Sequence, residues 1–198
     1  MVILKQNILI GKKIKTRLFS QKLAIFGIQF RHQMKRIMIF GVPGSGKSTW
    51  SIRLSERLNI PVYHLDRYFF VEDWKERNNQ EFLQMQQDLI SKDCWIIDGN
   101  CMRSLEMRFS RADTAFYFHF PRLLCLWRIF KRLFHRDKQI ADRAEGCSEQ
   151  VSWKLIVYLW KYDKKYKSLI EGLHEKYPHV KFYVLRNEQE VADIQVDI

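Results

Sequence analysis

The glycine-rich segment from Gly41 to Thr49 constrains this chain more than any other feature. It reads Gly-Val-Pro-Gly-Ser-Gly-Lys-Ser-Thr and matches the pattern G-x-x-x-x-G-K-[ST]. Three of the eight glycines in the chain, Gly41, Gly44 and Gly46, fall within six positions. A loop whose successive backbone N–H groups point into one concavity needs that conformational freedom. The segment therefore predicts a phosphate-binding loop, or P-loop.

The residues on both sides supply the context that such a loop requires. Before it, the apolar run Arg36 to Phe40 predicts a buried strand. After it, Lys47 to Leu58 has apolar residues at helical spacing, and a helix beginning there adds its positive N-terminal end to an anion site. Strand, glycine turn and helix together favour a phosphate site over a merely structural glycine turn.

The motif assigns a role to each of its polar side chains. Lys47 is expected to place its charge on the β- and γ-phosphates, and the Ser48 hydroxyl is expected to bind magnesium. We expect ATP with Mg²⁺ as the ligand, although the sequence does not distinguish ATP from GTP. The remaining residues expected to line the nucleotide are Gly41, Gly44, Ser45, Gly46 and Thr49.

Beyond the P-loop, apolar runs alternate with helical patterns, which predicts a parallel sheet covered on both faces. We expect one α/β domain with three layers, a five-stranded parallel sheet and a small helical lid. Further strands are expected at 61–65, 94–97, 114–120 and 180–185, and further helices at 80–91, 123–134, 148–176 and 188–194.

Two acids follow predicted strands, where the carboxyl ends of a parallel sheet line the ligand crevice. Asp98 ends the apolar run Cys94 to Ile97, so it is expected to hold magnesium through water; the alternative is a helix-capping role. Asp66 ends the run Pro61 to Leu65, and it is expected to orient an acceptor hydroxyl. A turn-forming aspartate is the equally weighted alternative.

Arginines are the third component, because guanidinium groups stabilise the charge of a transferring phosphoryl group. Arg128, Arg132 and Arg136 recur at four-residue spacing and so share one helical face, with Arg143 following. The alternative for each is a solvated basic face. Further candidates on the acceptor side are Arg77, Arg103 and Arg108.

In the long helix predicted at 148–176, Trp153, Ile156, Val157 and Trp160 form one stripe. This spacing is typical of a core-facing side, so no stacking platform for nucleic-acid bases is expected there.

Composition excludes several classes of protein. With 46% apolar and 28% charged residues, the chain has a globular composition, and no run approaches the roughly 20 apolar residues of a membrane span. Four scattered cysteines without metal-ligand spacing indicate a cytoplasmic protein with reduced thiols. The net charge of +12 is distributed unevenly along the chain, because residues 1–33 hold seven basic residues and no acidic residue.

That first segment, residues 1–33, is expected to be poorly ordered, with the P-loop domain at 34–198. Its basic amphipathic pattern leaves three interpretations open: a targeting peptide, an arm that binds membrane or nucleic acid, or an upstream extension that is not part of the domain. The third interpretation is preferred.

Several motifs together resemble one family, the bacterial topology modulation proteins (FlaR-related), which are small adenylate-kinase-like P-loop proteins. Besides the P-loop, the resemblance rests on 63–66 (YHLD), 94–100 (CWIIDGN), 120–122 (FPR) and 144–147 (AEGC), and it covers roughly 34–190. It implies a lid at about 128–147, in which Arg128 stacks on the nucleotide base and Arg132 contacts phosphate. Asn100 replaces the aromatic residue of adenylate kinases, which puts a nucleoside monophosphate acceptor in doubt.

These observations predict a kinase that transfers the γ-phosphoryl group of ATP to a small acceptor, with Lys47, Asp66, Arg128 and Arg132 as the catalytic set. The alternative is a nucleotide-dependent ATPase or regulator that acts with DNA. Direct contact with nucleic acid is not favoured, and an inactive scaffold is disfavoured by the intact Lys47, Ser48 and Asp98.

Overall fold

A computed structural model describes residues 34–71, 75–134 and 152–197. Its centre is a sheet of five parallel strands in the order β2-β3-β1-β4-β5. The strands are β1 (Arg36–Gly41), β2 (Val62–His64), β3 (Trp95–Asp98), β4 (Thr114–Phe118) and β5 (Lys181–Leu185).

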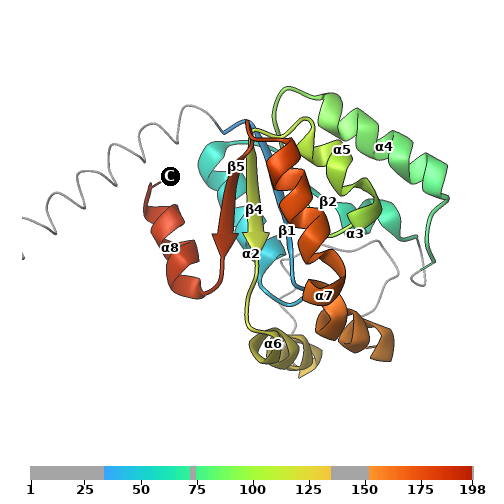
Figure 1. Ribbon diagram of the computed structural model, residues 1–198, viewed down its shortest axis with the longest axis vertical. Helices are drawn as coiled ribbons and strands as arrows, with labels where there is room; N and C mark the ends of the chain where they lie inside the picture. Colours follow the sequence, from blue (N-terminus) through green and yellow to red (C-terminus); the bar gives the residue numbers. More distant parts are fainter. Residues whose placement is uncertain (1–33, 72–74, 135–151, 198) are drawn as a thin grey trace, which may run out of the picture.

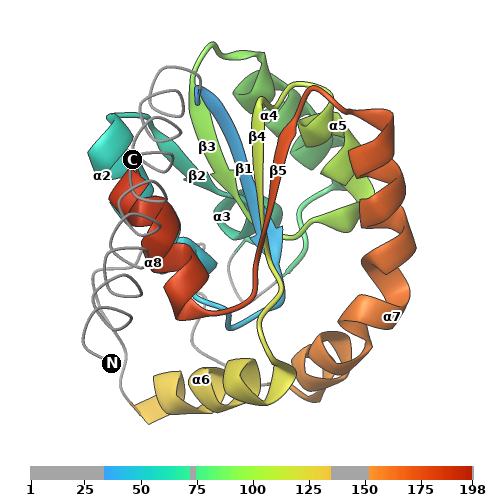
Figure 2. The same ribbon diagram turned by 60° about the vertical axis from the view of Figure 1, so that its left-hand side comes forward.

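Helices cover both faces of this sheet, which gives three layers (Figure 1). On one face lie α2 (Lys47–Leu58) and α8 (Glu188–Asp197), and on the other lie α4 (Asn79–Ser91), α5 (Leu105–Phe109) and α7 (Trp153–Lys176). A further helix, α6 (Arg122–Phe134), lies across the carboxyl end of the sheet (Figure 2). The short α3 (Leu65–Phe69) and the 3-10 turn η2 (Met102–Ser104) follow β2 and β3 directly.

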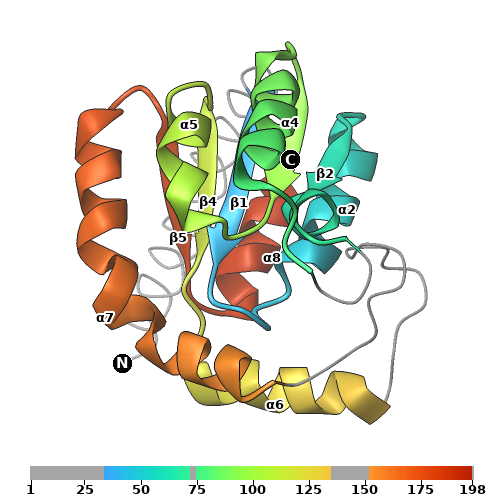
Figure 3. The same cartoon turned by 90° about the vertical axis from the view of Figure 1, so that its right-hand side faces the viewer.

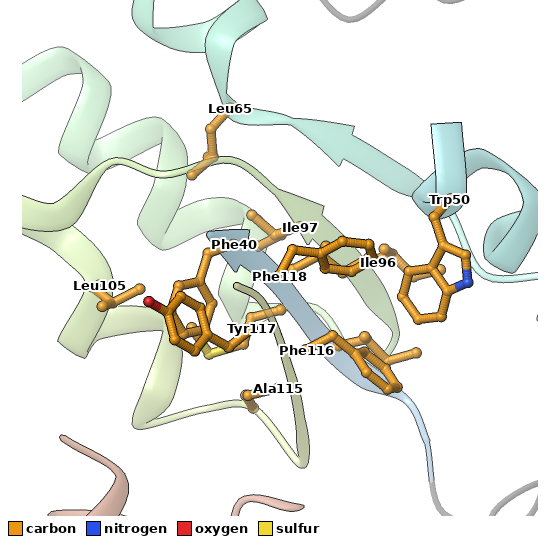
Figure 4. Close-up of a cluster of buried hydrophobic side chains, with 14 of the residues drawn as sticks. Phe40, Trp50, Leu65, Ile96, Ile97, Leu105, Ala115, Phe116, Tyr117 and Phe118 are labelled. Atoms are coloured by element: carbon orange, nitrogen blue, oxygen red, sulfur yellow. The ribbon is translucent and has the colours of Figure 1, made fainter. Parts of the chain in front are cut away.

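The central strands are buried on both sides, which explains their unbroken apolar sequences. All residues of β3 and β4 are buried, as are the last five of β1. On one face Trp50 of α2 packs edge-on against Phe116, with ring centroids 4.7 Å apart. On the other face Phe40 stacks on Tyr117 at 5.2 Å (Figure 4). The first contact fixes α2 to the sheet, and the second joins β1 to β4 within it.

The α/β class, the five parallel strands and the main helices are confirmed. Three short elements were not predicted, namely α3, η2 and α5. Each has three to five residues, which is less than two helical turns, so no apolar periodicity can develop in them.

The expected core stripe of α7 is wrong. Trp153 and Trp160 are 76% and 55% exposed, and the buried side chains are Leu159, Tyr162, Ile170 and Leu173. The helix carries apolar residues on more than one face, so spacing alone could not tell which face packs inward. Trp153 and Trp160 are therefore accessible from solvent, and burial in the core does not keep them from stacking on bases.

Two predictions fall outside the described residues: the state of residues 1–33, and most of the lid at about 128–147, of which α6 supplies 128–134. Within the described ranges, no helix has the length and apolar character needed to cross a bilayer. Cys94, Cys101 and Cys125 are free thiols.

Candidate functional site

The predicted P-loop lies at the carboxyl end of β1, where the chain turns into α2. Gly41, Gly44 and Gly46 all have positive φ, at 136°, 78° and 94°. In this conformation L side chains are disfavoured, so the three glycines of the motif stand where the backbone requires them. Gly46 directly precedes the first turn of α2, which contains no acidic residue to oppose an anion.

The loop is also packed tightly against its neighbours. A Cβ on Gly41 would lie 2.2 Å from the Phe118 carbonyl oxygen of β4, and one on Gly44 would lie 2.6 Å from the Cys125 carbonyl oxygen of α6. A Cβ on Gly46 would meet nothing within 4 Å. The first two glycines therefore hold the loop between β4 and α6, whereas Gly46 faces open space.

Lys47 folds back over its own loop. Its Nζ donates to the Val42 carbonyl oxygen at 2.9 Å and lies 3.5 Å from Ser45 Oγ. Burial lowers the pKa of Lys47, while the nearby charges of Asp98 and Asp66 oppose that shift. The buried ammonium group is thus held by loop oxygens, near enough to two carboxylates for their charges to act on it.

Asp98 ends β3, the strand directly beside β1, and pairs in register with Ile39. Its side chain is buried, and Oδ2 lies 3.0 Å from Nδ1 of His64, the last residue of β2. The other oxygen, Oδ1, is buried and has no hydrogen-bond partner in the described part of the chain. An orphaned buried carboxylate oxygen is costly unless a further group satisfies it.

This donor set fits a magnesium ion. The orphaned Asp98 Oδ1 and the hydroxyl of Ser48, in the first turn of α2, are the oxygen ligands that Mg²⁺ uses together with water and phosphate oxygens. Among residues 34–71, 75–134 and 152–197, no cluster of three His, Cys, Asp or Glu side chains could hold a metal by itself. A site of this kind therefore depends on the triphosphate for its remaining ligands.

Asp66 lies in the first turn of α3, immediately after β2, and its side chain is exposed. Its charge acts on Lys47 on one side and on Tyr158 of α7 on the other. Burial raises the pKa of the Tyr158 phenol, and the neighbouring Tyr166 and Asp66 raise it further. Asp66 thus lies near enough to Lys47 and to Tyr158 for its charge to act on both.

Helix α6 brings Arg128 to the opposite side of the loop. Its guanidinium donates to the Ser45 carbonyl oxygen at 3.3 Å, forms an ion pair with Glu188 at the start of α8, and lies 5.3 Å from the centre of the Phe120 ring. Arg132, one turn further on, is exposed, and its charge reaches Lys47. Arg128 therefore contacts the P-loop, and Arg132 is near enough for its charge to act on Lys47.

The other candidate arginines lie in different surroundings. Arg108 is fully buried and holds backbone carbonyls, so it does not face an acceptor. Arg77 donates to the Tyr68 carbonyl oxygen and to Glu81, whereas Arg103 is exposed on η2. Arg136 and Arg143 lie outside the described residues.

Comparison with solved structures adds one result on the fold. The shikimate kinase of Acinetobacter baumannii in complex with shikimate aligns over 86% of this chain and 96% of its own, with 14% identity and a TM-score of 0.55. The chain has the fold of the P-loop kinases. A shikimate kinase from Bacteroides thetaiotaomicron aligns over 82% of this chain and 95% of its own, with 16% identity and a TM-score of 0.48. A deoxyadenosine kinase from M. mycoides aligns over 81% of this chain and 94% of its own, with 16% identity and a TM-score of 0.45.

No family model matches the sequence, and no curated protein matches it either. The resemblance to the topology modulation proteins therefore rests on its motifs alone.

The sequence assigned no contact and no site role to three residues at this edge of the sheet. His64 pairs with Asp98, Asn100 accepts a hydrogen bond from the Gly41 N–H at 2.9 Å, and Glu188 pairs with Arg128. Each meets its partner across 34 to 60 residues of chain. No local sequence pattern predicts such contacts, because they depend on the order of the strands in the sheet.

Proposed function

We propose that this protein is an ATP- and magnesium-dependent phosphotransferase that moves the γ-phosphoryl group to a hydroxyl or phosphate oxygen of a small molecule. The observation that carries the proposal is that the charges of Asp98, which is buried, and Asp66, which is exposed, both act on the buried Lys47 at one edge of the sheet. Phosphoryl transfer depends on positioning and charge stabilisation, and this arrangement supplies both.

In the proposed step, an acceptor oxygen forms a bond to the γ-phosphorus while the bond from that phosphorus to the β–γ bridging oxygen breaks. ADP leaves with the electron pair, and the acceptor proton passes to Asp66 or, through it, to water. Lys47 and Arg132 balance the negative charge that spreads over the phosphoryl oxygens. Ser48, and Asp98 through water, would hold magnesium, which would supply further positive charge to the phosphates.

The nucleotide would lie with its phosphates over the P-loop, lined by Gly44, Ser45, Gly46 and Thr49, and its base beside α6. Arg128 already stands there against an aromatic ring, so stacking on a base requires only that its guanidinium leave Ser45 and Glu188. The Gly41 N–H already donates to Asn100, so this amide is not available to a phosphate. Gly41 would instead contribute to the shape of the loop.

Several finer points belong to this proposal. The aligned shikimate kinase is in complex with the small molecule shikimate, and a small-molecule acceptor is proposed for this chain as well. The proposal includes membership of the topology modulation family, which the motifs support, and a cytoplasmic setting with reduced thiols, which the free cysteines support.

The test is an acceptor screen with the full chain. ADP release from Mg·ATP is measured with a panel of alcohols, sugars, nucleosides and phosphate esters. Asp66→Asn should lower kcat with the responding acceptor by about 100-fold, because orientation of the acceptor proton is lost, while ATP affinity stays unchanged. The matched control is Asp88→Asn, an exposed aspartate on α4 that bonds Gln84.

Two outcomes would contradict the proposal. If no acceptor raises ADP release, or if Asp66→Asn turns over like the wild type, small-molecule transfer is not the function. Stimulation by DNA instead would support the ATPase alternative, which the exposed Trp153 and Trp160 now favour more than the sequence did.

A further inference from the structure

The turn that follows Asp98 reaches across to the first amide of the P-loop. Strand β1 pairs with β3 as far as Ile39 and Asp98, and the last backbone bond between them runs from Gly99 N–H to the Ile39 carbonyl oxygen at 3.0 Å. Beyond this point β3 has ended, so the buried Gly41 N–H has no strand partner on that side. Asn100 Oδ1 accepts it at 2.9 Å, which continues the ladder by one side-chain bond.

The turn carrying Asn100 is itself held by a buried arginine. Arg108 of α5 is fully buried, and its guanidinium donates to the carbonyl oxygens of Gly99 at 2.7 Å and Cys101 at 3.0 Å. No carboxylate bonds to this guanidinium in the described part of the chain. A buried guanidinium is costly unless its N–H groups are hydrogen-bonded. The turn must therefore keep these carbonyl oxygens in place around Arg108.

Asp98, Gly99 and Asn100 are consecutive, so one rigid turn touches both halves of the proposed phosphate site. Asp98 carries the buried oxygen that is proposed to hold magnesium, and Asn100 bonds the first amide of the loop that is proposed to bind the phosphates. A shift of the turn would therefore move the acid and the loop together. Neutral asparagine suits this place, because an acceptor is needed there but a second carboxylate would repel a triphosphate.

We propose that Asn100 is a positioning residue, which sets the P-loop relative to Asp98 by holding the Gly41 amide. This inference rests on the proposed function, because it concerns the affinity of the same site for nucleotide. It also gives a role to the residue in which this chain departs from adenylate kinases.

The test compares Asn100→Leu, which keeps the approximate side-chain volume but has no acceptor, with the wild-type full chain. We expect hydrogen exchange of the Gly41 amide to rise at least tenfold, and the Kd for Mg²⁺ with a non-hydrolysable ATP analogue to rise about tenfold. Asn100→Asp keeps an acceptor oxygen at the same reach, so it should restore the slow exchange of Gly41.

Gln86→Leu is the matched control for general damage. It removes a buried hydrogen bond to Ser104, whose hydroxyl in turn bonds the Cys101 carbonyl oxygen, yet it leaves Asn100 and the P-loop in place. It should lower the thermal midpoint without changing Gly41 exchange or nucleotide affinity. If Asn100→Leu does not fold, Asn100→Ser, whose shorter hydroxyl does not reach Gly41, should show the same two changes.

The outcomes separate the two claims. If the wild type binds the analogue and the Asn100 variants bind it equally tightly, the inference is wrong and the proposed function stands. A wild type that does not bind the analogue overturns the proposed function itself.

Discussion

Gly44 and Gly46 share a loop and a positive φ, yet the structure holds them for different reasons. At Gly44 the obstacle to a side chain is both the backbone conformation and the wall formed by Cys125 and Ile129 of α6. At Gly46 it is the backbone conformation alone. Substitutions at the two positions therefore distinguish the cost of backbone strain from the cost of steric crowding.

Gly44→Ala should destabilise the protein more than Gly46→Ala. Left-handed strain costs about 1–2 kcal/mol at either position, and displacing packed α6 atoms adds about 1–3 kcal/mol at Gly44. Urea unfolding of both variants and the wild type gives the two values. Equal losses would mean that α6 does not pack on the loop as described.

At this scale the sequence predicted the residues that are close together in the chain. Gly41 to Thr49 could be assigned because one motif fixes their relations locally. His64 and Asn100 could not be assigned, because their partners come from other strands. Arg108 was misplaced on the acceptor side, since an arginine in a polar stretch gives no sign that it will be buried.

Among the elements, α7 does most to join the carboxyl edge to the rest of the fold, running from α6 along the sheet (Figure 3). Its Asp163 bonds Arg122 at the start of α6 at 2.7 Å and lies 3.0 Å from His119, just after β4. Burial alone would raise the pKa of Asp163, but the hydrogen bonds from Arg122 and His119 outweigh it and hold the pKa below its ordinary 3.8.

The sign of the pH effect follows from that direction. An acid with a depressed pKa in the folded state stabilises the fold above its unfolded pKa and loses that contribution as pH falls through the folded pKa. Asp163→Asn should therefore cost about 1 kcal/mol of unfolding free energy at about pH 5, and the difference from wild type should vanish towards about pH 2.

Denaturant unfolding at several pH values checks this, with Asp93→Asn, an exposed aspartate outside this network, as the control. A difference between wild type and Asp163→Asn that stays constant down to about pH 2 would contradict the assignment.

Helices of several turns could be predicted from the sequence, whereas helices of five residues could not. Where a helix has apolar residues on more than one face, its inward face could not be predicted either. The twelve residues of α2 carry a clear pattern, while α3 and α5, with five residues each, do not. For α7 the helix was right and its inward face was wrong, because Trp153 and Trp160 compete with Leu159 and Tyr162 as apolar candidates. Only the packing of α6 and the sheet decides between those faces.

For the whole molecule, strand order is what turns separate motifs into one site. Placing β1 between β3 and β4 puts Asp98 on one side of the P-loop and α6 on the other. The sequence predicted a parallel sheet, and the fold of the P-loop kinases agrees with it. The positive charge also concentrates here, because α6 has four basic residues and no acid, as a site for polyphosphate requires.

The most direct test of this account is an equilibrium titration of the full chain with a non-hydrolysable ATP analogue, with and without Mg²⁺. We predict saturable binding that Mg²⁺ tightens, that Lys47→Ala weakens at least 100-fold without loss of the fold, and that Asp98→Asn weakens only when Mg²⁺ is present. Absence of saturable binding with Mg²⁺ supplied, or wild-type affinity in Lys47→Ala, would contradict the account.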